Sequence, residues 1–160
     1  MYDKWDVRFL ELAKHISSWS KDPSRKIGAV AVKNRQVMAT GYNGFPAGIS
    51  DDEERYDNRE LKYSLVVHAE MNCIYNASKN GMSLSGSTMF VYGLPVCSEC
   101  AKGIIQTGVE RVVIHAHNYT EERWINSFKK TIELFSEAGI ICDAIELPES
   151  VADAERYSRN

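Results

Sequence analysis

The sequence predicts a layered α/β domain in which helices cover a mostly central sheet. Two observations support this fold class. Short runs of β-branched residues alternate along the chain with longer segments whose apolar residues recur at helical spacing. The length of 160 residues is that of one domain, and a hydrophobic content of 44% is ordinary for a globular fold. We therefore expect a single domain over residues 1–147, followed by a polar tail over residues 148–160.

The first part of the chain is expected to contain a helix, a hairpin and a long loop. Apolar residues of segment 5–19 fall on one helical face, and Pro23 ends that segment. Two β-branched runs, 27–32 and 37–41, are joined by turn-like residues and predict a β-hairpin. Segment 41–58 is rich in glycine and then in acidic residues, so we expect a loop. A loop this long in a compact domain usually serves a function.

The second part is expected to alternate helices and strands. Segment 61–78 has a helical pattern, with His68 and Glu70 near its middle or at its true start. The remaining expected elements are a strand at 88–92, a helix at 97–107, a strand at 109–116, a helix at 121–138 and a strand at 140–145. Gly108 and Gly139 follow the two helices, as glycine commonly does at a helix end.

Charge and composition exclude several classes of protein. The formal net charge is −3 and no basic stripe is present, which disfavours a nucleic-acid-binding protein. A small anionic substrate remains compatible, because one phosphate needs only one or two cations. No apolar stretch approaches the roughly 18 residues of a membrane span, and no targeting signal is visible. We expect a cytoplasmic protein, or one in the host cytoplasm if the source is viral, with its four cysteines outside any disulfide framework.

The strongest chemical signal is a histidine followed much later by two cysteines. His68 precedes Ala69 and Glu70, and Cys97 and Cys100 form a C-x-x-C pair. Catalytic zinc sites use three protein ligands and leave the fourth position to water, and one His with two Cys supplies that set. The cysteine spacing fits the first turn of a helix, where the helix dipole favours thiolates. We therefore predict that His68, Cys97 and Cys100 bind one Zn²⁺ ion.

Glu70 lies too close to His68 in the sequence to be a routine further ligand. Its carboxylate can instead reach a zinc-bound water, accept a proton and redeliver it to a ring nitrogen of the substrate. The order H-x-E followed by P-C-x-x-C is the signature of zinc nucleobase deaminases, and this chain matches it except at the proline. We predict that Glu70 is the catalytic acid and base.

Each motif has other interpretations when it stands alone. A C-x-x-C pair also occurs in structural zinc sites and in redox pairs. A four-ligand structural site needs one more ligand, and Cys73 is a candidate, but its apolar surroundings favour a buried core thiol. The same holds for Cys142. The two motifs in order, each at an expected helix start, favour a catalytic site.

Several further segments resemble the deoxycytidylate (dCMP) deaminases of the cytidine and deoxycytidylate deaminase superfamily. The resemblance covers residues 5–145. It rests on Ser20-Lys21-Asp22-Pro23 with Ile27-Gly28-Ala29, on Gly41-Tyr42-Asn43-Gly44 with Pro46, Gly48 and Ser50-Asp51-Asp52, on residues 67–72, and on residues 97–101 with Ile104-Ile105-Gln106. One departure concerns the shape of a loop: the family usually has Pro directly before its first zinc cysteine, and here Val96 stands there, after Pro95.

The resemblance implies a three-layer α-β-α domain with a central five-stranded mixed sheet. It also implies a hydrolase acting on a cyclic amidine C–N bond, which converts dCMP to dUMP and ammonia and so supplies dUMP for dTMP synthesis. Members of the family are typically homo-oligomers, often hexamers, with one catalytic zinc per subunit. Many are activated by dCTP and inhibited by dTTP, so we expect the same effectors here.

The resemblance also implies roles for individual residues. Asn43 is expected to contact the sugar or base, the Ala69 backbone to hold the pyrimidine carbonyl, and Tyr119 and Arg123 to bind the 5′-phosphate. Candidates for allosteric nucleotide contacts are Ser24, Lys26, Gly41, Tyr42, Gly44, Asp51 and Asp52. The acidic run 51–54 is also a candidate to hold Mg²⁺ that accompanies dCTP or dTTP.

Three alternatives stay open at this point. The substrate could be dCTP, free cytidine or a modified dCMP. A nucleic-acid substrate is disfavoured by the pI of 5.8. A non-catalytic nucleotide sensor that keeps zinc for structure is disfavoured by Glu70, because a sensor needs no proton shuttle.

Overall fold

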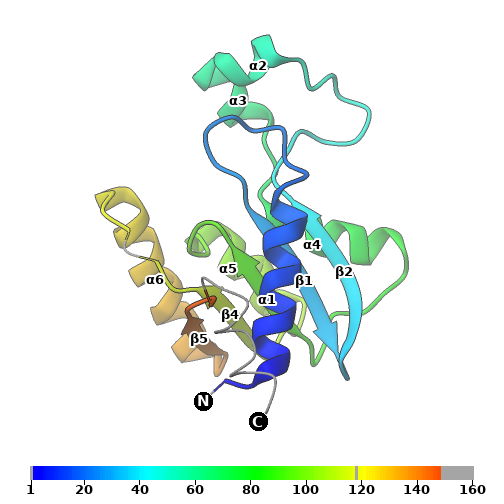
Figure 1. The fold of residues 1–160 in the computed structure, drawn as a ribbon, viewed down its shortest axis with the longest axis vertical. Coiled ribbons are helices and arrows are strands. Elements are labelled where there is room, and N and C mark those ends of the chain that lie inside the picture. Colours follow the sequence, from blue (N-terminus) through cyan, green and yellow to red (C-terminus); the bar gives the residue numbers. More distant parts are fainter. Residues whose placement is uncertain (1, 118, 149–160) are drawn as a thin grey trace.

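The computed structural model of the chain describes residues 2–117 and 119–148. These residues form a five-stranded sheet, in the order β2-β1-β3-β4-β5, between two helical layers. Helix α1 covers one face, and α4, α5 and α6 cover the other (Figure 1). The fold is therefore the three-layer α-β-α arrangement expected from the sequence, with its mixed central sheet.

The elements have the following bounds. The strands are β1 (Gly28–Lys33), β2 (Gln36–Tyr42), β3 (Thr88–Tyr92), β4 (Arg111–His115) and β5 (Ile141–Ile145). The helices are α1 (Lys4–Ser17), α2 (Glu53–Asp57), α3 (Arg59–Leu65), α4 (Ala69–Lys79), α5 (Ser98–Gln106) and α6 (Glu122–Ala138). The predicted strand 88–92 and the predicted hairpin are confirmed, and Gly139 ends α6 with a φ of 76°.

Strand direction decides where the loops meet. Strand β1 runs antiparallel to both β2 and β3, whereas β3, β4 and β5 are parallel. Gly28, at the start of β1, pairs with Tyr92, at the end of β3. The loop that enters β1 and the loop that leaves β3 therefore lie at the same edge of the sheet.

The two faces of the sheet have separate apolar cores, because neighbouring residues of a strand point to opposite faces. Val30, Phe90 and Val113 pack under α1, with apolar residues of that helix such as Leu10. The alternate positions, among them Ala29, Ala31, Met89, Val91 and Val112, pack against α4, α5 and Phe135 of α6. The three central strands β1, β3 and β4 are thus buried on both faces, whereas the edge strands β2 and β5 are partly exposed.

Two predicted boundaries were wrong. The segment expected to be one loop, 41–58, contains the short helix α2. The segment expected to be one helix, 61–78, is two helices, because Val67 exchanges backbone hydrogen bonds with Gly44 (2.8 and 3.1 Å) instead of continuing α3. His68 therefore stands at the true start of the second helix, one of the two positions left open by the sequence.

Two expectations concern the ends of the chain and membranes. Residues 149–160 of the expected polar tail lie outside the described residues. Within the described ranges, no helix combines the length and the apolar character needed to cross a bilayer.

Candidate active site

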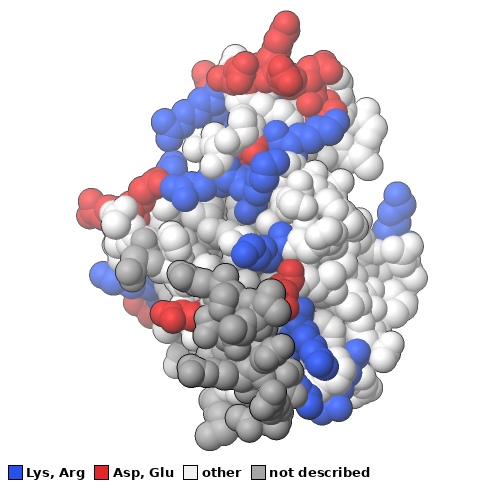
Figure 2. All heavy atoms as spheres, in the orientation of Figure 1, with Lys and Arg blue, Asp and Glu red and all other residues white. Residues whose placement is uncertain are grey.

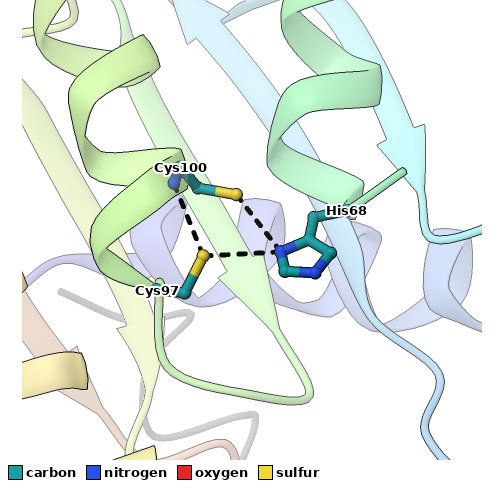
Figure 3. A group of neighbouring side chains, drawn as sticks. All are labelled: His68, Cys97 and Cys100. Atoms are coloured by element: carbon teal, nitrogen blue, oxygen red, sulfur yellow. Dashed lines mark hydrogen bonds between the residues drawn. The ribbon is translucent and has the colours of Figure 1, made fainter. Parts of the chain in front are cut away.

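Three potential metal ligands meet where two helices begin. His68 is the N-cap residue of α4, Cys97 is the N-cap residue of α5, and Cys100 lies in the first turn of α5. The two sulfurs each lie 3.4 Å from His68 Nδ1, and the three ligand atoms all lie within 4.8 Å of one another (Figure 3). Among the described residues, this is the group of His, Cys and acidic side chains that could hold a metal ion.

The spacing of these atoms suits zinc. Zinc–sulfur bonds of about 2.3 Å and zinc–nitrogen bonds of about 2.0–2.1 Å at tetrahedral angles place sulfur and nitrogen roughly 3.5 Å apart. The observed separations match this value without any rearrangement. Hydrogen bonds from Cys100 and His68 lower the pKa of the Cys97 thiol, so a thiolate is already favoured there. Both α5 and α4 direct their N-terminal ends toward the group, which also favours negative charge.

Glu70 lies beside this group at the second position of α4, where it is only 4% exposed. Burial raises the pKa of its carboxyl to about 7. A carboxyl with a pKa near neutrality can both accept and donate protons at physiological pH. The charge of a bound cation acts in the opposite direction and favours the carboxylate.

Close packing of glycines positions both helix starts. A Cβ on Gly41 would lie 2.3 Å from the Cys73 nitrogen and 2.4 Å from the Ala69 oxygen, so β2 can approach α4 this closely only without a side chain. A Cβ on Gly93 would lie 2.5 Å from the Lys26 oxygen, in the loop that leads to Cys97. These two contacts fix the backbone on either side of the metal ligands.

The departure at Val96 leaves the metal ligands in place. Val96 is fully buried in the core under α5, and its carbonyl accepts a 2.8 Å hydrogen bond from the Thr131 hydroxyl of α6. Cys97, the next residue, still caps α5 in an extended conformation. A side-chain hydroxyl on a neighbouring helix thus supports the loop directly before Cys97.

A cavity of about 450 Å³ opens in front of these residues. His68, Glu70 and Cys97 line one side of it. The rest of the wall comes from the loop before β1, from the segments that follow β2, β3 and α3, from α2 and α3, and from the starts of α4 and α6. Its residues are Asp22, Pro23, Ser24, Arg25, Ile27, Asn43, Tyr56, Asp57, Arg59, Lys62, Tyr63, Val66, Ala69, Leu94, Pro95, Arg123 and Trp124. A metal group at one side and several cations in the wall suit an anionic substrate.

Comparison with known proteins agrees with this arrangement. The family described as "Cytidine and deoxycytidylate deaminase zinc-binding region" matches residues 3–116. The chain belongs to this family. As deaminases hydrolyse a C–N bond, it is a hydrolase of that class, and the three-ligand group is its zinc site.

Relatives of this deaminase cover most of its length. An "Uncharacterized deaminase in luxG 3′region" of Aliivibrio fischeri is 39% identical over 143 residues, which cover 88% of this chain and 92% of that protein. The deoxycytidylate deaminase of Homo sapiens is 38% identical over 124 residues, covering 74% and 68%. A crystal structure of the dCMP deaminase of cyanophage S-TIM5 with dCMP and dUMP has a TM-score of 0.71 at 27% identity, covering 91% of this chain and 99% of that chain.

Two of the residues expected to bind substrate line the cavity of the deaminase beside the zinc ligands. Asn43 is 4% exposed and braces the loop before β1, since its amide donates to the Arg25 carbonyl (2.8 Å) and accepts from the Ile27 nitrogen (2.9 Å). Ala69 is fully buried at the start of α4. Both therefore lie within reach of a ligand in the cavity.

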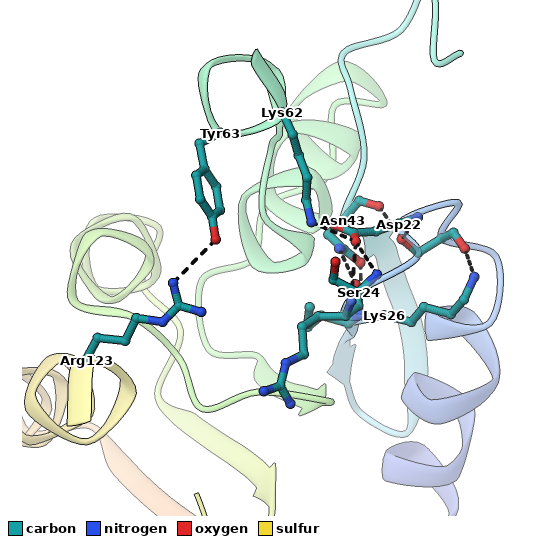
Figure 4. Close-up of polar contacts among 10 residues, drawn as sticks. Asp22, Ser24, Lys26, Asn43, Lys62, Tyr63 and Arg123 are labelled. Atoms are coloured by element: carbon teal, nitrogen blue, oxygen red, sulfur yellow. Dashed lines mark hydrogen bonds and ion pairs between the residues drawn. The ribbon is translucent and has the colours of Figure 1, made fainter. Parts of the chain in front are cut away.

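The two residues expected at the 5′-phosphate are placed differently. Arg123 lines the cavity, and its Nη1 donates to the Tyr63 hydroxyl at 3.4 Å (Figure 4). Tyr119 is not among the lining residues and packs half-buried against the core, with its ring centroid 5.2 Å from that of His117. Burial raises the pKa of Tyr119 to about 12. The structure thus brings Arg123, but not Tyr119, to the cavity.

Most residues expected at an allosteric site have structural contacts outside the cavity. Ser24 lines the cavity, whereas Lys26 donates to the Ser20 carbonyl and extends away from Arg123 (Figure 4). Asp51 forms a 2.9 Å ion pair with Lys21, and Asp52 precedes α2 and accepts from Ser50. The remaining residues of this set are Gly41, packed on α4, Gly44, paired with Val67, and Tyr42, whose ring lies edge-on to Trp19.

Several residues that line the cavity were not predicted from the sequence. Arg59, Lys62 and Tyr63 come from α3, and Lys62 forms a buried 2.9 Å ion pair with Asp22 across the cavity wall. Arg25 comes from the loop before β1. No motif marks these residues, because they reach the cavity only through contacts between distant segments.

The remaining cysteines of the deaminase do not join the zinc site. Cys73 is fully buried in the core of α4 and Cys142 is half-buried on β5, and burial raises the pKa of Cys73 to about 12 and of Cys142 to about 11. The interpretation of Cys73 as a buried core thiol is confirmed.

Proposed function

We propose that this deaminase hydrolyses dCMP to dUMP and ammonia, and that dUMP so formed supplies dTMP synthesis. One observation carries the proposal: a buried carboxyl beside a zinc site and a set of guanidinium groups face the same cavity. The cytosine ring suits the carboxyl and the zinc site, and a 5′-phosphate suits the guanidinium groups. The dCMP and dUMP in the cyanophage enzyme support this choice of nucleotide.

Glu70 carries the proton transfers in the proposed reaction. Zinc bound by His68, Cys97 and Cys100 supplies a Lewis acid that makes water more acidic. Glu70 takes a proton from the attacking water and delivers it to N3 of the cytosine ring, which makes C4 electrophilic. The water oxygen forms a bond to C4, and Glu70 then takes the proton that remains on that oxygen and gives it to the amino nitrogen. The bond from C4 to the amino nitrogen breaks as the C4 carbonyl forms, so that water is consumed and ammonia released.

The wall of the cavity supports a phosphate at the other end of the substrate. Arg25, Arg59 and Arg123 all line it, and guanidinium groups bind phosphate oxygens in pairs. Figure 2 shows Lys and Arg side chains gathered below the acidic side chains at the α2 end of the molecule. A free nucleotide fits this local charge, even though the net charge of the chain is negative.

The activity is tested by ammonia release, or by loss of cytosine absorbance, from zinc-loaded protein given dCMP. Deoxycytidine, cytidine, dCTP and a single-stranded oligonucleotide are assayed in parallel. Turnover that is fastest with dCMP supports the proposal. Preference for dCTP or cytidine would replace the proposed substrate. Zinc-loaded protein that binds nucleotide without turnover would favour the alternative of a non-catalytic nucleotide sensor.

We also propose that dCTP activates and dTTP inhibits the enzyme, with Mg²⁺ accompanying the triphosphate, and that the chain acts as a cytoplasmic homohexamer. The resemblance of segment 41–52 to a nucleotide-binding loop supports regulation. A change from sigmoidal to hyperbolic dCMP kinetics on addition of dCTP and Mg²⁺ is expected. A hyperbolic curve that neither nucleotide alters would contradict regulation, and light scattering of the purified protein tests the hexamer.

A further inference from the structure

Four hydrogen-bond donors converge on the carboxylate of Glu121, at the N-cap of α6. Arg123 contacts Oε2 through Nε at 3.0 Å and Nη2 at 2.9 Å, and the Trp124 indole nitrogen donates to the same oxygen at 3.0 Å. Arg25 Nη2 contacts Oε1. Two guanidinium groups and an indole N–H around one anion form the kind of environment that binds phosphate.

The residues that donate these bonds face the cavity, whereas the carboxylate does not belong to its lining. Arg25, Arg123 and Trp124 line the same cavity as His68 and Glu70. On the other side of the Arg123 guanidinium lies the Tyr63 hydroxyl (Figure 4). The anion site formed by Arg25, Arg123 and Trp124 is therefore open to a nucleotide from the cavity and to Glu121 from the start of α6.

The contacts of Glu121 are of a kind that another anion can replace. The side chains of Arg25, Glu121 and Arg123 are 46%, 39% and 49% exposed, and exposed ion pairs contribute little to stability. A phosphate monoester carries about −1.5 to −2 charges and three strong acceptor oxygens, against one charge on a carboxylate. Phosphate is thus the stronger ligand for two arginines.

We propose that Glu121 is a resident counterion of the phosphate site, and that the 5′-phosphate of the substrate displaces its carboxylate from Arg25 and Arg123. The inference rests on the proposed function, which supplies the phosphate. The competition lowers the affinity of the site for every anion by the same factor, because each must displace the carboxylate before it binds. Glu121 then sets how tightly the site holds a phosphate, and it touches no reacting atom.

The test is Glu121→Gln, which keeps the size and one acceptor oxygen of the side chain but removes its charge. The KM for dCMP and the inhibition constant of inorganic phosphate are both expected to fall about three- to tenfold, as the loss of two exposed ion pairs allows. The kcat for dCMP is expected to stay within about twofold, and kinetics with deoxycytidine, which lacks the phosphate, to stay unchanged.

The matched control is Glu122→Gln, which removes the same charge from an exposed neighbour in the first turn of α6. Its constants are expected to equal those of the wild type. A rise in KM and in the phosphate inhibition constant of Glu121→Gln would show that Glu121 positions the arginines and would overturn the proposal. Equal effects in both variants, or none in Glu121→Gln, would overturn it as well.

Failure of the proposed function gives a different result. Wild-type protein that turns over no dCMP removes the proposed substrate but leaves the anion site testable by calorimetry with inorganic phosphate. Tighter phosphate binding by Glu121→Gln than by both the wild type and Glu122→Gln would then still support the counterion. Equal binding by all three would refute it.

Discussion

Glu70 shows how the position of one residue defines its chemistry. It stands two residues after the ligand His68, yet its side chain is buried and lies outside the group of ligand atoms. The start of α4 determines the place of each side chain, because the N-cap residue His68 joins the metal group and the second helical residue, Glu70, lines the cavity beside it. A carboxyl held this way is available for proton transfer instead of coordination.

Replacing Glu70 by Gln should therefore separate turnover from metal binding. The amide cannot carry the proton, and loss of a positioned acid and base lowers kcat by about 10²- to 10⁴-fold. Zinc content should stay at that of the wild type, because the three ligands are unchanged. Assays of dCMP turnover and metal analysis of the same preparation check both parts.

Glu99→Gln is the matched control for that variant. Glu99 is an exposed carboxylate between the two cysteines, where it pairs with Lys102 at 2.7 Å. The Glu99→Gln substitution removes the same charge close to the zinc ligands, but Glu99 does not line the cavity. Normal turnover of this variant is therefore expected. Near-normal turnover of Glu70→Gln would refute the role assigned to Glu70.

The single residues differ in how far the sequence could predict them. His68, Glu70, Cys97 and Cys100 were predictable because zinc chemistry demands certain residue types at a certain spacing. The partners Arg25 and Glu121 are 96 positions apart and carry no such requirement. Their proximity depends on how α6 packs beside the loop before β1, which no local pattern encodes.

At the scale of elements, the contact between β2 and α4 determines the position of the zinc ligand His68, which begins α4. Gly41 allows the two backbones to touch, and Asn72 and Asn76 of α4 add hydrogen bonds to the Tyr42 and Thr40 carbonyls at 2.8 Å each. The sequence identified Gly41 through its resemblance to a nucleotide-binding loop. The structure gives it a packing role that periodicity alone could not reveal.

Gly41→Ala should consequently destabilise the protein. The new methyl group must push α4 away from β2, and overpacking of this kind costs about 1–3 kcal/mol. A fall in Tm of several degrees is expected in thermal unfolding, for a chain of this length. Weaker zinc binding should accompany it, because His68 begins α4.

The matched control for this prediction is Gly44→Ala, three residues further along the chain and just after β2. A Cβ on Gly44 meets no atom closer than 3.8 Å, so the Tm is expected to stay close to that of the wild type. Equal stability of the Gly41→Ala and Gly44→Ala variants would show that the contact between β2 and α4 tolerates a side chain.

Element boundaries followed the sequence where strand and helix patterns were strong. Strand β3 and the end of α6 at Gly139 were predicted at the observed residues. The break between α3 and α4 was not, because the apolar spacing of 61–78 continues through Val66 and Val67. A long-range bridge to Gly44 decides that break, and such a bridge leaves no trace in local periodicity.

In the whole molecule, the reaction site and a stabilising ion network lie at opposite ends of the central strands. The cavity lies where β1 begins and β3 ends, near Tyr92. Arg111 lies at the opposite ends of these strands, where it pairs with Thr88, the first residue of β3. Its guanidinium joins Asp6 of α1, at 2.7 and 3.0 Å, to Asp143 of β5, at 2.8 Å. One side chain thus ties the N-terminal helix to the edge strand.

Arg111→Met should lower stability without altering the reaction. Loss of charge-assisted hydrogen bonds to Asp6, which is only 7% exposed, is expected to lower the free energy of unfolding by about 2–3 kcal/mol. Chemical denaturation measures this change, and the KM for dCMP at a temperature well below the transition should match that of the wild type. A double-mutant cycle with Asp6→Asn isolates the pair, since neighbouring partners couple by about 0.5–3 kcal/mol. Additive effects of the two substitutions, or an altered KM, would show that the ion network does not act as a separate support of the fold.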